Sequence, residues 1–313
     1  MFTSVMPDIE AAGRLLKRLG YPIYLKYLAI KDRTDMNLRA PVFIVGAGRS
    51  GTTILGKCFS ILPYVCYLYE ERELWSTIDP CTYIQRYMDG KPLDLALPPV
   101  QSQQQHRMER IWHSITAYHN RSLIVEKNPD NSFRLEWLHS LNPLSQIVWI
   151  IRDGREVAQS VVRHSLKSGT YRLSPFRACH PWWGEGEIKW KSIVHSCQKH
   201  DIYCGLVNLD ELTEFEKALI EWLFATERCL HFRNAHPDTV VAIRYEEFIT
   251  QPDKTWPALM DSLGFERNEN VEKYVRHNVR KQTEYTEFPE CREMILAAYQ
   301  KMCCRLDEVV TVG

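Results

Sequence analysis

The 313-residue sequence has no excess of charge of either sign, with 39 lysine and arginine residues against 39 aspartate and glutamate residues. A neutral chain has no overall electrostatic attraction for nucleic acid or for an anionic membrane surface, so neither is expected as a partner. No apolar run approaches the roughly 18 residues that a membrane span needs, and the N-terminus lacks the hydrophobic segment of a signal peptide. We therefore expect a cytoplasmic protein with no membrane partner.

The sequence also lacks the spacings that are typical of metal sites and disulfide frameworks. His180, His195 and His200 are too irregularly spaced for a zinc site, and no Cys-x-x-Cys pair accompanies them. The ten cysteines are scattered through a chain that is long enough to form a full hydrophobic core. Disulfide frameworks are expected in much shorter secreted chains, so most of these cysteines are expected as buried thiols and no metal is expected at the site.

Residues 41–55 read PVFIVGAGRSGTTIL and contain a glycine-rich turn between two regular elements. The apolar run Val42–Val45 predicts a buried strand, and the pattern after the turn predicts a helix. Backbone N–H groups in such a turn, together with the positive end of the helix dipole, bind a phosphate-like anion. Arg49 adds a cation inside the turn. We therefore expect this loop to bind a phosphorylated ligand.

The loop fits more than one class of nucleotide. Gly46, Gly48 and Gly51 satisfy the dinucleotide-binding pattern, and an acidic pair follows about 20 residues later, where a ribose-binding acid is expected. The nucleoside-triphosphatase pattern also matches from Gly46 to Gly51, but Thr52 stands where that pattern needs a lysine. A dinucleotide-binding oxidoreductase and a P-loop small-molecule kinase are therefore alternatives for this loop.

A second motif follows another apolar run, Gln146–Ile151, which again predicts a buried strand. Arg152 comes directly after this strand, Asp153 is suited to cap the next helix, and Ser160 lies a little over two helical turns further on. A cation at a strand end with a hydroxyl on the following helix suits a second phosphate. Together the two motifs predict a ligand with two anionic ends.

The two motifs resemble those of the sulfotransferases that use 3′-phosphoadenosine 5′-phosphosulfate (PAPS). In that family an [RK]-[ST]-G-T-[ST] loop holds the 5′-phosphosulfate, an R-x7-S element holds the 3′-phosphate, and an R-Y-E-x-[LF] segment follows later. The matching residues here are Arg49, Ser50, Gly51, Thr52 and Thr53 in the loop, Arg152 and Ser160 in the second element, and Arg244–Phe248 in the third.

The resemblance implies a P-loop α/β fold with a central, mostly parallel sheet that is flanked by helices. Residues 41–313 are expected as a single domain, with residues 1–40 as a helical segment packed on it. The hydrophobic pattern predicts helices over residues 108–119, 214–234 and 254–263. Residues 80–105 and 167–191 are expected to be irregular.

The loop, which has arginine rather than lysine at its first motif position, is most similar to the loop of the tyrosylprotein and carbohydrate sulfotransferases. This likeness implies which residues are catalytic. It aligns the general base on Glu70, with Glu71 and Glu73 as rivals. Lys127, in an E-K-N-P segment, would reach the oxygen that bridges phosphorus and sulfur, although a surface position is the alternative. Arg49 would help to stabilise the negative charge on that oxygen.

Further ligand contacts are expected from three later segments. Tyr245 would lie beside the nucleotide, and Arg280 and Lys281 would close over it, although the G-x-x-G-x-x-K form of the family is absent. The residues expected in the substrate pocket are Glu71, Trp182, Trp183 and Glu185. The alternative is that both tryptophans anchor their loop to the core.

These assignments predict a PAPS-dependent sulfotransferase that moves a sulfuryl group, in line, to a hydroxyl or amine of an acceptor. The product nucleotide would be adenosine 3′,5′-bisphosphate (PAP), a stable anion that needs no metal. The tyrosine and carbohydrate enzymes carry a Golgi anchor that is missing here, so the expected acceptor is a soluble small molecule. The protein is expected to be a monomer or homodimer. An oxidoreductase would leave Arg152 and Ser160 unexplained.

Overall fold

The computed structural model of the chain describes residues 38–82, 91–169, 171–174, 177–279 and 287–312. Most of the N-terminal segment expected at residues 1–40 lies outside the described residues. Arg280 and Lys281, which are expected to close over the nucleotide, also lie outside them. The segments that are expected to be irregular, residues 80–105 and 167–191, are described except for residues 83–90, 170, 175 and 176.

A five-stranded parallel sheet forms the centre of the fold, as the sequence predicts. Its strands lie in the order β2-β3-β1-β4-β8, and each neighbouring pair is parallel. Parallel strands are covered on both faces, which explains why they read as short, continuous apolar runs. The strands are β1 (Val42–Val45), β2 (Val65–Tyr69), β3 (Leu123–Lys127), β4 (Gln146–Ile151) and β8 (Val240–Arg244).

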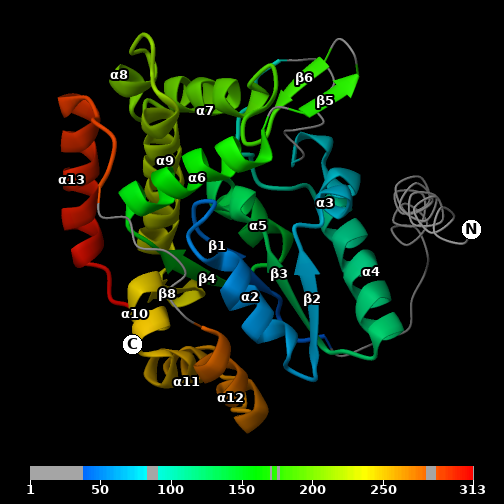
Figure 1. Cartoon of the computed structure of the whole chain (residues 1–313). Helices are drawn as coiled ribbons and strands as arrows, with labels where there is room; N and C mark the ends of the chain where they lie inside the picture. Colours follow the sequence, from blue (N-terminus) through cyan, green and yellow to red (C-terminus); the bar gives the residue numbers. More distant parts are fainter. Residues whose placement is uncertain (1–37, 83–90, 170, 175–176, 280–286, 313) are drawn as a thin grey trace, which may run out of the picture.

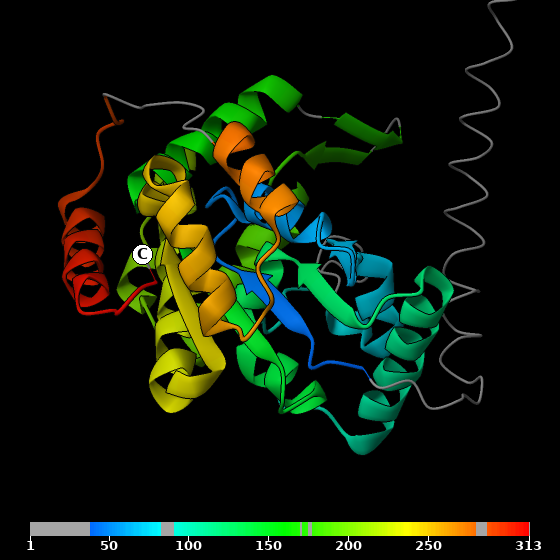
Figure 2. The ribbon, with the colours of Figure 1, turned by 90° about the horizontal axis from the view of Figure 1, so that it is seen from below.

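Helices cover both faces of the sheet, which gives three layers (Figures 1 and 2). On one face Val42 and Ile44 of β1 belong to a core with α2 (Thr52–Ser60), α11 (Pro252–Ser262) and α12 (Glu269–Asn278). On the other face Phe43 and Val45 pack with the remaining main helices. These are α4 (Ser102–His119), α5 (Leu135–Leu141), α6 (Gly154–Ser168) and α9 (Glu214–Ala235). The alternation of side chains along β1 thus supplies two cores from one apolar run.

Shorter elements complete the described chain. The helices are α3 (Arg72–Ile78), α7 (Ile188–Lys199), α8 (Cys204–Val207), α10 (Tyr245–Thr250) and α13 (Glu293–Asp307), and the 3-10 turns are η1 (Pro80–Thr82), η3 (Pro129–Phe133) and η4 (Pro237–Thr239). A small antiparallel sheet contains β5 (Tyr171–Ser174), β6 (Arg177–His180) and β7 (Gly184–Glu185). None of the helices within the described ranges combines the length and the apolarity that crossing a bilayer requires.

Two segments that were expected to be irregular contain regular structure. The glutamine-rich tract at residues 101–105 begins α4, where the side chains of Gln101 and Gln104 form a capping box. Glutamine is a good helix former, so the polar tract extends the predicted helix by about two turns. Within residues 167–191, the sheet of β5, β6 and β7 precedes α7. Its strands are two to four residues long and are therefore too short for alternation to predict them.

Candidate active site

The glycine loop between β1 and α2 is packed between two aromatic rings. A Cβ atom on Gly48 would lie 2.6 Å from Cη2 of Trp182, and one on Gly51 would overlap the ring of Tyr245. Gly51 also has a φ of 97°, in the left-handed region that side chains disfavour. These two positions therefore need glycine for close approach of the rings, and Gly51 needs it for backbone conformation as well.

The loop has the features of an anion site. Gly51, the residue before α2, has no side chain that could cap the helix, and no acidic residue lies in the first turn of this helix. Its first N–H groups and the positive end of its dipole therefore face the loop without a competing carboxylate. Within the described part of the chain, the hydroxyl of Ser50 is buried and has no hydrogen-bond partner. The residues present thus fit a phosphate-like group.

Arg152, at the carboxyl end of β4, connects the second motif directly to this loop. Its Nη1 donates to the carbonyl oxygen of Arg49 at 3.0 Å, and its guanidinium lies over the ring of Tyr245 at 4.4 Å from the centroid. Both Nε and Nη2 donate to Oε2 of Glu156, at 3.2 and 2.7 Å. In turn, Nε of Arg49 donates to the hydroxyl of Ser160 at 3.1 Å. Both motifs therefore belong to one site.

The start of α6 is fixed beside this site by Asp153. Its Oδ1 accepts from the backbone N–H groups of Arg155 and Glu156, as a helix cap. Its Oδ2 accepts from the hydroxyl of Tyr299 on α13 at 2.6 Å. The backbone N–H of Asp153 donates to Oε1 of Glu246, whose pKa is raised by burial. The C-terminal helix is thereby linked to the second motif.

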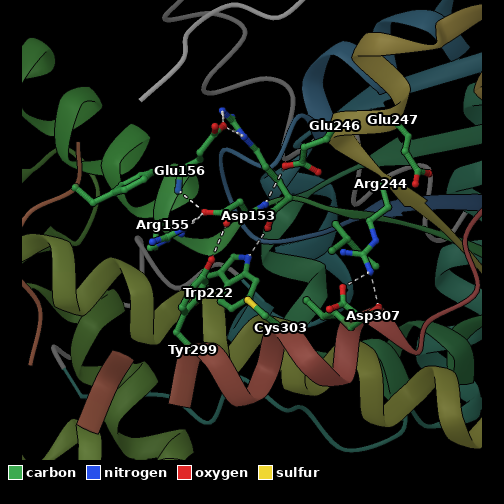
Figure 3. A pocket seen from close by; sticks show the side chains of 14 residues that line it. Asp153, Arg155, Glu156, Trp222, Arg244, Glu246, Glu247, Tyr299, Cys303 and Asp307 are labelled. Atoms are coloured by element: carbon green, nitrogen blue, oxygen red, sulfur yellow. Dashed lines mark hydrogen bonds and ion pairs between the residues drawn. The ribbon is translucent and has the colours of Figure 1, made fainter. Parts of the chain in front are cut away.

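A cavity of about 850 Å³ opens next to Arg152 (Figure 3). Its walls come from the start of α6, the end of β8, and α13. Arg155 lies over the rings of Phe288 and Tyr299, at 4.8 and 5.3 Å from their centroids. Arg244 donates to the carbonyl oxygen of Leu306 at the foot of the same cavity. Cations and carboxylates alternate around this space, so its lining has no uniform charge.

Glu70 and Lys127 meet at the ends of the neighbouring strands β2 and β3. The backbone N–H of Glu70 donates to the carbonyl oxygen of Lys127 at 2.9 Å, and their side chains form an ion pair. The other oxygen of Glu70 lies 3.3 Å from Nη2 of Arg72. Nζ of Lys127 also lies 4.1 Å from the centroid of Tyr69. Lys127 is only 1% exposed, so the alternative surface position is wrong.

The two rival bases lie in the same turn as Glu70. Glu71 is the residue before α3, and Glu73 is in the first turn of that helix. A further carboxylate, that of Asp130, was missed in the sequence although it stands three residues after Lys127. Burial would raise the pKa of Asp130, but Lys189, 3.9 Å away, and other nearby cations outweigh burial and hold this pKa below its ordinary value. Asp130 is therefore a second ionised carboxylate on the Lys127 side of the site.

The two adjacent tryptophans, Trp182 and Trp183, differ in burial. Trp183 is fully buried, and its indole donates to Oε2 of Glu214 at 2.6 Å. Trp183 is therefore an anchor of the segment, and the expectation that it lines a substrate pocket is wrong. Trp182 is half-buried and lies against the glycine loop, as described above. Glu185 lies in the short strand β7.

The part of the chain that the structure describes contains no group of three or more histidine, cysteine, aspartate or glutamate side chains arranged to hold a metal ion. The described site contains backbone N–H groups, hydroxyls, cations and carboxylates. These groups suit anion binding and proton transfer.

Comparison with known proteins shows the family of this chain. The model of the "Sulfotransferase family" matches residues 41–203, just over half of the chain. Among solved structures, the sulfotransferase domain from the curacin biosynthetic pathway is 15% identical, with a TM-score of 0.51, over 88% of this chain and 100% of that domain. Sulfotransferase STF9 from Mycobacterium avium is 13% identical, with a TM-score of 0.55, over 96% of this chain and 84% of that one.

Sulfotransferase STF1 from Mycobacterium tuberculosis H37Rv is also similar, with 15% identity and a TM-score of 0.50 over 92% of this chain and 82% of that one. At these identities the solved structures show a shared fold. A comparison with curated protein sequences found no match. The family match covers both β1 with its glycine loop and β4 with Arg152 and Ser160. The chain therefore belongs to the sulfotransferase family, and it is an enzyme with the P-loop α/β fold of that family.

Proposed function

We propose that the protein transfers a sulfuryl group from PAPS to a hydroxyl or amine of a small-molecule acceptor, and that residues 41–313 form the single domain that does so. The observation that carries this proposal is the contact between the two motifs. Arg152 donates to the carbonyl oxygen of Arg49, and Arg49 donates to Ser160. One compact site thus presents two sets of anion-binding groups, which suits a nucleotide with separate 3′- and 5′-phosphates.

The loop groups would hold the 5′ end of PAPS. The N–H groups at the start of α2, with Thr52 and Thr53, face the loop, and the buried hydroxyl of Ser50 is suited to donate to a phosphosulfate oxygen. Arg152 and Ser160 would hold the 3′-phosphate, and the ring of Tyr245 supplies a flat wall between the two groups. When bound, PAPS supplies the sulfuryl group and a bisphosphate leaving group.

Lys127 and Glu70 would serve the transfer itself. A buried ammonium group at the end of β3 stabilises negative charge that develops on the leaving oxygen, as Arg49 does from the loop. Movement of Lys127 toward that oxygen would release Oε1 of Glu70 from their ion pair. Glu70 would then accept the proton of the attacking hydroxyl or amine. The acceptor–sulfur bond forms as the bond from sulfur to the bridging oxygen breaks, and this oxygen keeps the electron pair.

The expected acceptor is a small molecule. Beside the tryptophan segment, Glu187 pairs with Lys217 at 3.1 Å. A screen of phenols, alcohols and amines with 35S-labelled PAPS, in buffer with a metal chelator and without ATP, tests the proposal. Transfer of label to an acceptor, lost in Lys127→Met, would support it. A parallel screen uses γ-32P-labelled ATP with magnesium. Transfer of phosphate there, and no transfer of sulfate in the first screen, would contradict the proposal in favour of a kinase.

A further inference from the structure

A buried ion pair lies behind the glycine loop, between α7 and α9. Nζ of Lys189 is 2.6 Å from Oε1 of Glu221, and the two side chains are 8% and 4% exposed. Removing two charges from water is costly, and a buried pair is often no more stabilising than apolar residues of the same volume. Stability alone is therefore a weak explanation for this pair.

The pair holds the indole of Trp182 in two ways. The second oxygen of Glu221 accepts from Nε1 of Trp182 at 2.6 Å. Nζ of Lys189 lies 4.4 Å from the centroid of the same ring, as a cation–π contact. The backbone N–H of Trp182 also donates, at 3.2 Å, to Nδ1 of His180. A hydrogen bond thus holds the edge of the indole, a cation–π contact holds its face, and a further hydrogen bond holds the main chain of Trp182.

The far edge of this indole rests on the glycine loop. Cη2 and Cζ2 of Trp182 lie only 2.6 and 2.8 Å from the position that a Cβ atom on Gly48 would take. On its other side the ring of His164, from α6, is 5.9 Å away by centroids. Gly48 precedes Arg49, whose side chain reaches Ser160. The position of Trp182 therefore limits where the loop that carries Arg49 can move.

We propose that Lys189 and Glu221 are positioning residues, which hold Trp182 as a rigid wall against the glycine loop. Neither side chain contacts the loop directly among the interactions of the described residues, so both act through the indole. The wall keeps the loop in the conformation that presents its N–H groups to an anion. This inference rests on the proposed function only for the identity of that anion, because the wall itself is a contact within the chain.

Hydrogen exchange of the loop tests this inference without any ligand. Trp182→Phe removes the bond to Glu221 and shortens the ring. Lys189→Met with Glu221→Leu removes both charges of the pair together, and it also removes the cation that lies 3.9 Å from Asp130, so Trp182→Phe is the cleaner of the two variants. The backbone N–H groups of Gly46 and Ser50 are hydrogen-bonded in the loop, to the hydroxyl of Ser132 at 2.8 Å and to the carbonyl oxygen of Ala47 at 3.1 Å. In both proteins these two amides should exchange about tenfold faster or more, the change expected when a charge-assisted hydrogen bond no longer resists local opening. Glu136→Gln is the matched control, because Glu136 pairs at 2.6 Å with Arg228 on the same helix α9.

Loop exchange that is unchanged in Trp182→Phe would overturn the inference, and so would equal acceleration in the Glu136→Gln control. If the double variant does not fold, Trp182→Phe alone decides. Titration with adenosine 3′,5′-bisphosphate adds a second readout, in which the affinity should fall by a similar factor in both variants and no further in their combination. Failure of the unaltered protein to bind this nucleotide would contradict the proposed function, while the exchange result would still decide the role of the wall.

Discussion

Replacement of Arg152 by alanine is the sharpest perturbation of the proposed nucleotide site. Arg152 is 9% exposed, so its charge acts where water screens little. Loss of a hydrogen bond to a charged group costs about 1.5–3 kcal/mol, which corresponds to about 10- to 150-fold in affinity. We expect Arg152→Ala to weaken the binding of adenosine 3′,5′-bisphosphate by this factor.

Two further contacts of Arg152 affect how the result is interpreted. In the unaltered protein the carboxylate of Glu156 accepts two hydrogen bonds from Arg152. Without the arginine this carboxylate would repel the incoming phosphate. The substitution also removes the donor to the carbonyl oxygen of Arg49, and with it one support of the loop. Arg152→Ala with Glu156→Gln removes the repulsion, and Glu156→Gln alone, which keeps the arginine, is the matched control.

Calorimetric titration of each variant with the bisphosphate and with adenosine 5′-monophosphate separates these effects. The monophosphate lacks the 3′-phosphate, so loss of Arg152 should weaken its binding far less. The preference of the protein for the bisphosphate should therefore disappear in Arg152→Ala and persist in Glu156→Gln. Equal weakening of both nucleotides would show that Arg152 acts only by supporting the loop, and an unchanged preference would refute the assignment of the 3′-phosphate to this residue.

Three other perturbations have defined outcomes. Glu70→Gln should retain bisphosphate binding and lose about 100-fold or more of turnover, whereas Asp130→Asn should keep most of it; the reverse order would make Asp130 the base. Gly51→Ala should abolish nucleotide binding and lower the melting temperature. The control is Gly264→Ala, because Gly264 also has a positive φ, +66°, but open space around it, so this substitution should lower the melting temperature less. Equal effects would argue against the packing of Tyr245 on Gly51. Burial raises the pKa of Glu126 from 4.5 to about 8, so the folded protein keeps a proton that the unfolded chain releases. The free energy of unfolding should therefore fall as the pH rises from about 4.5 to about 8 and then level off. Chemical denaturation at several pH values measures this decline, which should be missing in Glu126→Gln.

The sequence predicted strands β1 and β4, and the motif that follows each of them, because these features depend on local pattern. Val42–Val45 and Gln146–Ile151 are continuous apolar runs, and each is followed directly by residues that we propose bind anions. In a parallel sheet, adjacent strands bring their carboxyl ends together, so the meeting of Arg49 and Arg152 follows from topology. The same parallel topology pairs Ile44 of β1 with Lys127 of β3.

The parts that could not be predicted depend on contacts between distant segments. Lys189 and Glu221 belong to two different helices that follow the second motif. The residues next to each of them in the sequence do not indicate that the two form a buried pair. The difference between Trp182 and Trp183 is of the same kind. Adjacent residues point in different directions, and only the positions of Glu214 and Glu221 along α9 decide which indole is buried and which faces the loop.

The central claim is that one site binds a nucleotide with two separate anionic ends, and calorimetry in metal-free buffer tests it most directly. Unaltered protein should be titrated with adenosine 3′,5′-bisphosphate, with ADP and with NAD, and ADP should then be repeated with magnesium. The account predicts that the bisphosphate binds more tightly than ADP by at least the factor expected from Arg152, with no measurable binding of NAD. Tighter binding of ADP with magnesium, or of NAD, would contradict it.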